Sequence, residues 1–439
     1  MKPHVLAKSP LAVALALLAA CGSPSPDAPQ DAAEVQLDSS ADDPTPSTIA
    51  LSYVPDDSNT GRAIAAAQAT LRERPEDIGA HVQLAILFMR HQRETSNAAL
   101  MRYAEDVLAS ARDLAPEDPQ VKLLRAMAMQ DGHRFEQAAA TAREVLAADP
   151  SDATAHLVLA DAQLELGEYE GAMDSVQAAI DLHPDLRSYN RAAHLRWLMG
   201  DFDSALAIME LAIDAGSPRD PESRAWCFAD LGAMYLHRGD APRALASSDR
   251  ALALVPDYVP GLVVRARALA RAEQLDEAIA TLEPAVDRKA SVEDLLRLSD
   301  WHEAVGNAEA AAQRLAQAQR LADDDPRPMA QWLARRGTQP QRALELAEQA
   351  AAQRSDIASN DALALAAARA GQLARAQEAM DAALVLGTAD ANLHLHAALV
   401  HALAGRIEAA RAALAKADAI DSGADPMLRA EMQQRVGAA

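Results

Sequence analysis

Apolar residues recur at three- and four-residue spacing along most of the chain, which is the pattern of amphipathic helices. The clearest example lies within residues 153–186, where one apolar stripe runs through Leu159 and stops at Gly167. A second stripe begins at Tyr169 and ends before Pro184, which a helix interior does not accommodate. This stretch therefore predicts two antiparallel helices joined by a tight turn.

The same hairpin pattern returns along the chain. Small residues at one position of the second helix recur at spacings of mostly 32–34 residues: Ala138, Ala172, Ala205, Ala244, Ala278, Ala311, Ala343, Ala376 and Ala410. A second series follows seven residues later: Val145, Ala179, Ala212, Ala251, Ala285, Ala318, Ala350, Ala383 and Ala417. Glycines precede the first series by five residues: Gly167, Gly200, Gly239, Gly306, Gly371 and Gly405. Three series in step predict a solenoid in which each hairpin packs on its neighbours.

Large apolar residues fill the position next to the turn: Phe135, Tyr169, Phe202, Leu275, Leu373 and Ile407. Together with the small, glycine and proline positions, this pattern resembles the tetratricopeptide repeat (TPR) over nearly the whole chain after residue 60. The resemblance implies an all-α fold, a right-handed superhelical solenoid of antiparallel helix pairs. We expect about ten repeats over residues 60–424, followed by a capping helix and tail at 425–439.

Two places depart from the period. An insertion between Ile213 and Ala225 lengthens one spacing to 39 residues, and Asp220 followed by Pro221 is typical of an N-cap and first helical residue. In the eighth repeat, prolines at 328 and 340 predict a short first helix over 329–336. These places are expected to bend the solenoid or change its twist.

Residues 1–20 combine two lysines with an apolar run that is too short to span a bilayer comfortably. The run ends in Leu18-Ala19-Ala20-Cys21, which resembles the lipobox of bacterial lipoproteins. The resemblance implies that Cys21 is acylated after cleavage and anchors the protein without a membrane span. The residue after Cys21 is glycine rather than aspartate, which in a Gram-negative cell implies the periplasmic side of the outer membrane. An ordinary secretory signal beside a chance cysteine is the alternative.

Residues 21–59 are rich in Ser, Pro, Ala and acids, and the first basic residue after Cys21 is Arg62. Such a segment cannot bury enough apolar surface to order itself, so we predict a disordered acidic tether. Its one apolar patch, at 51–54, is expected to dock on the first helix.

The charge balance limits the classes of partner. The net charge of −23 and a pI near 4.9 disfavour nucleic acid and anionic lipid as partners. With 50% hydrophobic but 3% aromatic residues, the core is expected to consist mainly of Ala and Leu. Once Cys21 is assigned to acylation, Cys227 remains alone and is expected to be a packed small residue rather than a reactive thiol.

No common catalytic motif occurs in the chain. The nearest resemblance to a metal site is His394, His396 and His401, but on a helix His396 would point away from the other two. We therefore predict no catalytic residues, no metal and no cofactor. The histidines are expected to occupy half-buried packing positions.

In TPR proteins the first helix of each hairpin lines a concave groove. The corresponding positions carry aromatic, basic and amide residues, which are types that anchor partner chains. The groove residues predicted in this way are Arg187, Asn190, His194, Trp197, Trp226, His237, Arg267, Arg271, Trp332, Arg335, Arg336 and Arg369. We expect this groove to receive an acidic or extended peptide segment. A register shift of one residue would instead bury Trp197.

The predicted function is that of an envelope-anchored, non-enzymatic TPR adaptor or scaffold, for example in pilus, secretion or envelope assembly. The alternative is a periplasmic enzyme or its accessory subunit. That alternative would gain support if His194 and His237 met carboxylates around a pocket. A homo-oligomer in which one copy's groove holds the acidic tether of another remains a further possibility.

Overall fold

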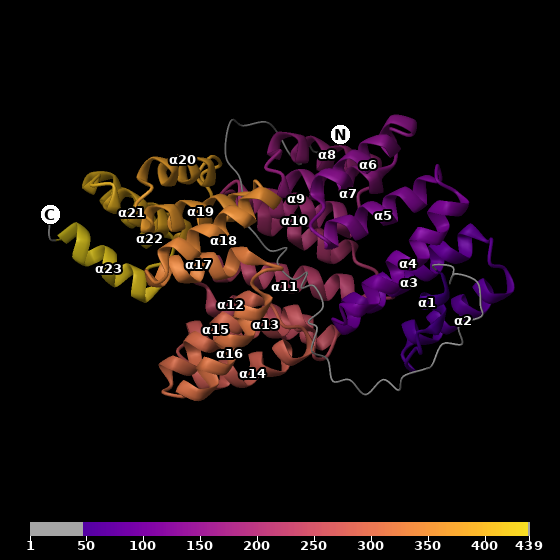
Figure 1. The fold of residues 1–439 in the computed structure, drawn as a ribbon, viewed down its shortest axis with the longest axis horizontal. Coiled ribbons are helices and arrows are strands. Elements are labelled where there is room, and N and C mark those ends of the chain that lie inside the picture. Colours follow the sequence, from indigo (N-terminus) through magenta and orange to yellow (C-terminus); the bar gives the residue numbers. More distant parts are fainter. Residues whose placement is uncertain (1–46, 438–439) are drawn as a thin grey trace. The chain divides into compact units, whose positions relative to one another are not determined.

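The computed structural model describes residues 47–437, which contain 23 α-helices and no strands (Figure 1). The helices are α1 (Ser47–Ser52), α2 (Asn59–Glu73), α3 (Ile78–Thr95), α4 (Ala99–Leu114), α5 (Pro119–Asp131), α6 (Phe135–Ala148), α7 (Ala153–Glu165), α8 (Tyr169–Leu182), α9 (Leu186–Leu198), α10 (Phe202–Ala215), α11 (Pro221–His237), α12 (Ala241–Leu254), α13 (Val259–Arg271), α14 (Leu275–Arg288), α15 (Val292–Ala304), α16 (Ala308–Leu321), α17 (Pro326–Arg336), α18 (Pro340–Gln353), α19 (Ile357–Arg369), α20 (Leu373–Ala383), α21 (Ala391–Leu403), α22 (Ile407–Ile420) and α23 (Pro426–Gly437). The predicted all-α solenoid class is confirmed.

The repeated positions have the roles that their residue types predict. Every alanine of the first series is buried, with at most 9% of its surface exposed. The six glycines have φ between 69° and 81°, a left-handed conformation that ends the first helix of each hairpin at little steric cost. The large turn-side residues are the first residues of α6, α8, α10, α14, α20 and α22. Buried alanines and glycine turns thus build these hairpins in the same way.

Contacts divide the described chain into two compact units, an N-terminal unit of residues 47–158 and a C-terminal unit of residues 159–437. The boundary falls inside α7, within the range that the sequence assigns to one solenoid. The two units are described separately below.

The N-terminal unit has an aromatic cluster in its core. Tyr53 packs against Phe88 and Tyr103, with ring centroids 5.4 and 5.2 Å away. The Gln68 amide donates to the carbonyl oxygens of Ala50 and Tyr53 at 2.9 and 3.0 Å. The prediction of a disordered tether is therefore wrong for residues 47–52, which form α1, because Ala50 and the neighbouring tyrosine bury enough apolar surface to hold this segment.

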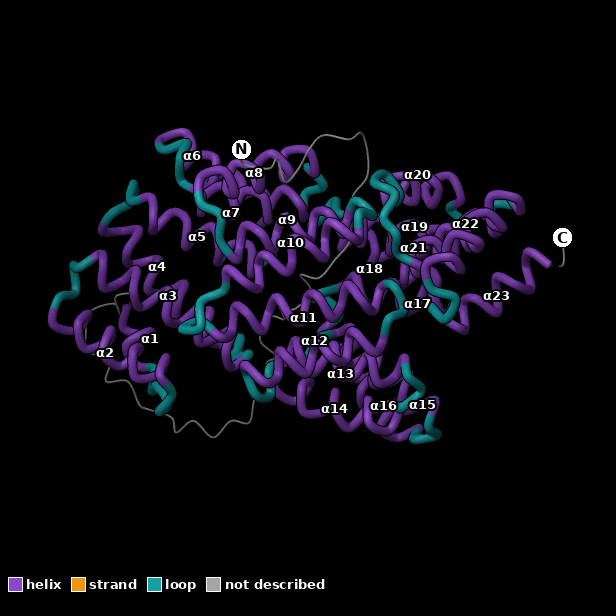
Figure 2. Tube along the Cα trace, turned by 180° about the vertical axis from the view of Figure 1, so that it is seen from behind, coloured by secondary structure: helices purple, strands orange, loops and turns teal. Residues whose placement is uncertain are grey.

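Within the C-terminal unit, turns of early hairpins contact loops far along the chain. The Ser355 amide donates to the Glu165 carbonyl at 3.1 Å, and the Thr388 hydroxyl donates to the Leu198 carbonyl at 3.1 Å. The carboxylate of Asp421 lies against the turn at Gly239. We call these three contacts, which join turns 165–167, 198–200 and 237–239 to loops 354–356, 387–390 and 421–425, the closing contacts. In Figure 2 the turns and loops are the teal segments between purple helices.

The two irregular places of the sequence are both ordered. Asp220 is the N-cap of α11 and Pro221 is its first residue, as predicted. Helix α17 starts three residues earlier than the predicted 329–336, because prolines at 326 and 328 lie in the first turn, where no intrahelical amide donor is required.

Among the described residues, none of the helices combines the length and apolar character that a membrane span requires.

Candidate partner-binding face

The predicted groove residues lie on the first helices of five hairpins, α9, α11, α13, α17 and α19, all in the C-terminal unit. Arg187 is exposed, Asn190 and Trp197 are buried, and the others are half-buried. We call the surface formed by these helices the inner face. Most of its polar groups are engaged with other residues of the chain, as the following contacts show.

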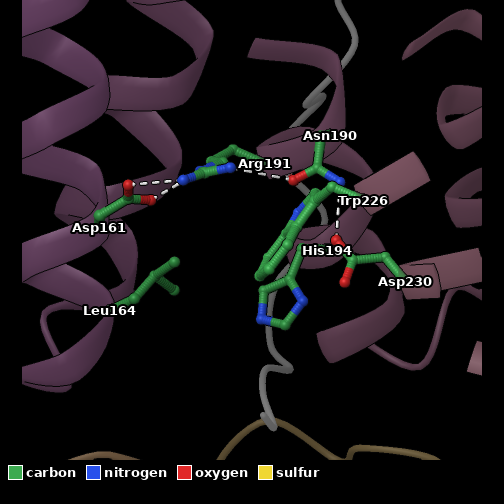
Figure 3. Close-up of a pocket in the computed structure, with 7 residues that line it drawn as sticks. All are labelled: Asp161, Leu164, Asn190, Arg191, His194, Trp226 and Asp230. Atoms are coloured by element: carbon green, nitrogen blue, oxygen red, sulfur yellow. Dashed lines mark hydrogen bonds and ion pairs between the residues drawn. The ribbon is translucent and has the colours of Figure 1, made fainter. Parts of the chain in front are cut away.

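A small cavity opens between α7, α9 and α11 (Figure 3). Asp161 accepts two hydrogen bonds from Arg191, at 2.8 and 2.9 Å. The amide of Asn190 accepts from Arg191 at 3.1 Å and donates to Asp230 at 2.8 Å. Four polar side chains from three helices thus form one continuous network. Leu164, His194 and Trp226 complete the lining.

Burial dominates the titration of the cavity. It raises the pKa of Asp230 to about 7, against the opposing effects of its hydrogen bond from Asn190 and the charge of Arg191. Burial and the nearby Arg191 lower the pKa of His194 to about 4, so this imidazole is neutral at pH 7. The cavity volume of about 20 Å³ admits roughly one water molecule. It is therefore too small to receive a substrate in this structure.

Trp197 is buried between two imidazoles, with its ring centroid 5.7 Å from that of His194 and 4.8 Å from that of His237. His237 in turn hydrogen-bonds through Nδ1 to the carboxylate of Asp390. The indole is thus a packing element of the inner face, and His237 has a carboxylate partner outside the cavity lining.

A second cluster surrounds Asp300 of α15. Its carboxylate accepts hydrogen bonds from Trp332 at 2.9 Å, Arg335 at 2.6 Å and Arg336 at 2.9 Å. The Arg336 guanidinium also lies 4.8 Å from the centroid of the Trp332 ring, within cation–π range. The three residues predicted on α17 therefore converge on one acid of the preceding repeat.

The remaining predicted arginines differ in how they are paired. Arg369 donates to the Ala334 carbonyl at 2.8 Å and to both carboxylate oxygens of Glu431, and Arg271 hydrogen-bonds Asp421. Arg267 makes no hydrogen bond or ion pair with any residue in the described part of the chain. Burial and the nearby Arg297 lower the pKa of Arg267. Arg187 is exposed, and its Nε atom lies 3.4 Å from the Asp185 carboxylate.

Sequence reasoning identified the cations of this face and missed their acidic partners. A signal for some partners does exist, because a charged or polar residue often faces its complement about one repeat later. Such pairs are Asp161 with Arg191, Asp300 with Arg335, Gln331 with Asp361, and Asp361 with His396. A search for acids 30–36 residues from a basic or amide side chain would have found them. The acids at 390 and 421–431 lie much farther along the chain and had no such signal.

The expectation that the histidines of the metal resemblance are half-buried is wrong for His394 and His396, which are buried because α19, α20, α22 and α23 all pack on α21; His401 is half-buried. His396 is buried and hydrogen-bonds Asp361 at 2.7 Å. Within residues 47–437 there is no group of three or more His, Cys, Asp or Glu side chains that could hold a metal ion. Cys227 is a free, fully buried residue, and burial raises the pKa of its thiol, as expected for a packed side chain. Cys21, the predicted lipidation site, lies outside the described residues.

The fold and the inner face define a helical-repeat protein whose first helices carry aromatic and basic residues. Two tetratricopeptide repeat family models match the chain, over residues 123–186 and 186–215. The chain therefore carries tetratricopeptide repeats.

Curated relatives share part of this chain. It is 27% identical over 224 residues to TPR repeat-containing thioredoxin TTL4 of Arabidopsis thaliana. The aligned region covers 47% of this chain and 33% of that protein. It is 28% identical over 214 residues to cellulose synthase operon protein C of Pseudomonas fluorescens (strain SBW25), which covers 46% of this chain and 16% of that protein. The chain thus spans a third or less of the length of each relative.

Among solved structures, the crystal structure of PilW, a type IV pilus biogenesis factor, is 26% identical to the chain. The match has a TM-score of 0.38 and covers 46% of this chain and 92% of that one.

Proposed function

We propose that this protein is a TPR adaptor of the bacterial envelope that binds partner proteins on its inner face and catalyses no reaction. The observation that carries the proposal is the placement of Trp226, Arg267 and Trp332 on the first helices of three hairpins, α11, α13 and α17, in a chain that carries TPR repeats. All three side chains are half-buried, so they keep part of their surface for a partner while the remainder is already held in place. Preordered aromatic and arginine side chains make effective anchors because little side-chain entropy is lost on binding.

The envelope location rests on the predicted acylation of Cys21 and on the residue that follows it. The similarity to cellulose synthase operon protein C, a protein of Pseudomonas fluorescens, supports a bacterial setting, and the proposed partner is a protein of an envelope assembly. Replacement of Cys21 by Ser should abolish acylation, so that the protein no longer incorporates a labelled fatty acid. Equal incorporation of the label by the wild type and the Cys21→Ser variant would refute the lipid anchor at this position.

The binding face can be tested by cross-linking the protein in its native envelope and identifying the captured proteins. A variant with Trp226→Ala, Arg267→Glu and Trp332→Ala should lose its main partner. A matched control with Leu182→Ala, Leu211→Ala and Arg219→Glu changes one charge and two large apolar groups at exposed positions, and should keep that partner. Equal capture by both variants would mean that the partner binds elsewhere.

A further inference from the structure

We propose that acids of the C-terminal segment 390–431 act as an internal ligand of the inner face, and that the partner is an acidic protein segment that takes their place. The inference rests on the proposed function, because it names the chemistry of the partner and the state of the same face before binding.

Four of the predicted groove residues are engaged by acids from this one segment. His237 contacts Asp390, and Arg271 contacts Asp421. Arg335 lies 3.4 Å from Asp425, and Arg369 pairs with Glu431 through two hydrogen bonds of 2.7 and 2.8 Å. These pairs join positions 62 to 153 residues apart, so they do not belong to the local contacts that build each hairpin. The segment thus presents carboxylates where an acidic partner would present them.

The surroundings of these pairs favour the charged forms of the acids. Enclosure acts to raise the pKa of Asp390, but the charge and hydrogen bond of His237 outweigh it and lower that pKa. The same balance holds for Glu431, whose pKa is lowered by hydrogen bonds from Arg369 and Arg435 against the effect of burial. The cations therefore hold anionic carboxylates, and a neutral or basic segment would not replace them.

The internal ligand is placed where it can be displaced. Its last part is α23, the single yellow helix in Figure 1, which packs on α21 and α22. Two buried apolar side chains, Leu428 and Met432, anchor this helix. A helix held by few buried apolar groups opens at a low free energy cost compared with the core. A partner with several carboxylates can therefore compete for Arg271, Arg335 and Arg369.

A binding experiment with the full chain tests the inference. The inner variant carries Asp421→Asn, Asp425→Asn and Glu431→Gln, which remove the competing charges with little change in side-chain shape. The Asp425→Asn change keeps the side-chain oxygen that caps α23. Asp390 is left unchanged because it caps α21, whose side chains form part of the core. The probe is a fluorescein-labelled decaglutamate peptide, followed by fluorescence anisotropy at low ionic strength.

A matched outer variant carries Asp323→Asn, Glu345→Gln and Glu408→Gln. These acids are exposed and pair with Arg342 and Arg411 of the second helices α18 and α22, and their removal changes the net charge by the same amount. We expect the inner variant to bind the probe at least about tenfold more tightly than the wild-type chain, and the outer variant to stay within about twofold of it. Equal binding by the inner and outer variants would overturn the inference.

Hydrogen exchange of the wild-type chain keeps the test decisive if the inner variant does not fold. Saturating decaglutamate should accelerate exchange of the α23 amides, since displacement of the acids loosens that helix. Unchanged exchange in α23 with the probe bound would overturn the inference. If cross-linking finds a partner on the inner face while the probe results are negative, the proposed function stands and this inference alone fails.

Discussion

The glycine turns of the C-terminal unit fall into two groups that share a sequence position and a backbone conformation. Gly167, Gly200 and Gly239 are closing turns, in which a Cβ atom would lie 2.7 to 3.3 Å from an atom of a distant loop. Gly306, Gly371 and Gly405 are open turns, in which a Cβ atom would meet nothing within 4 Å. All six have positive φ. The same repeat position therefore has two roles. In the open turns the glycine only ends the helix of its own hairpin, and in the closing turns it also packs against a distant loop.

This difference has a consequence for stability. In a simple solenoid each repeat touches only its neighbours, and a local defect stays local. The closing contacts add couplings between residues 182 to 190 positions apart. Defects in the closing turns should therefore weaken two regions at once, whereas defects in the open turns should weaken one.

The largest expected effect is the loss of stability when a methyl group is added to a closing turn. The same change in an open turn serves as the comparison. Gly167→Ala should lower the free energy of unfolding by about 3 kcal/mol, because the left-handed backbone is strained and the new Cβ meets the Ser355 carbonyl oxygen. Gly371→Ala carries only the backbone strain and should cost about 1 kcal/mol. Urea unfolding of both variants measures the difference, and equal losses would break the distinction between the groups.

A second prediction concerns pH at the first closing turn. Burial and the nearby charge of Asp356 raise the pKa of Glu165 to about 7, from an unfolded value near 4.5. The folded state therefore binds this proton more tightly than the unfolded state, and stability falls as the pH rises from about 4.5 to 7. Glu165→Gln should remove about 2 kcal/mol of this pH dependence. Urea unfolding at pH 5 and pH 8 measures this difference. If the free energy of unfolding changed equally between the two pH values in the wild type and the variant, the account would be contradicted.

The smallest expected effect concerns the second closing turn. Thr388→Val removes the hydroxyl that donates to the Leu198 carbonyl and should cost about 1 kcal/mol, because the side chain is fully buried. Thr281→Val removes a solvent-exposed hydrogen bond from the hydroxyl to the Glu277 carbonyl within the same helix, and should change stability by less than about 0.5 kcal/mol. A pair of thermal melts compares them, and similar shifts would show that the Thr388 bond does not couple the two regions.

The period of the sequence predicts the hairpins well because each repeated residue acts through contacts with its own or the adjacent repeat. An alanine at Ala172 or Ala205 is buried for the same reason in each copy, and a glycine such as Gly371 ends its helix without outside help. Segment 47–52 escaped prediction because its order comes from Tyr53 and Gln68 rather than from its own composition.

The site is less accessible to sequence reasoning. The cations of the inner face follow from their repeat positions, and Asp300 could have been found from its spacing to Arg335. The contact of Arg271 with Asp421 could not, because it depends on the small rotation between successive hairpins summed over several repeats. No local pattern records that sum, so which distant repeats meet is visible only in the structure.

Amide hydrogen exchange at Ser355 tests the closing contacts most directly. Ser355 and Ala290 are both exposed residues that directly follow the C-cap of a second helix, but only the Ser355 amide donates to a carbonyl on a distant turn. After correction for intrinsic rates, we predict that the Ser355 amide exchanges at least about tenfold more slowly than the Ala290 amide. Equal rates at the two positions would mean that the closing contacts do not form in solution.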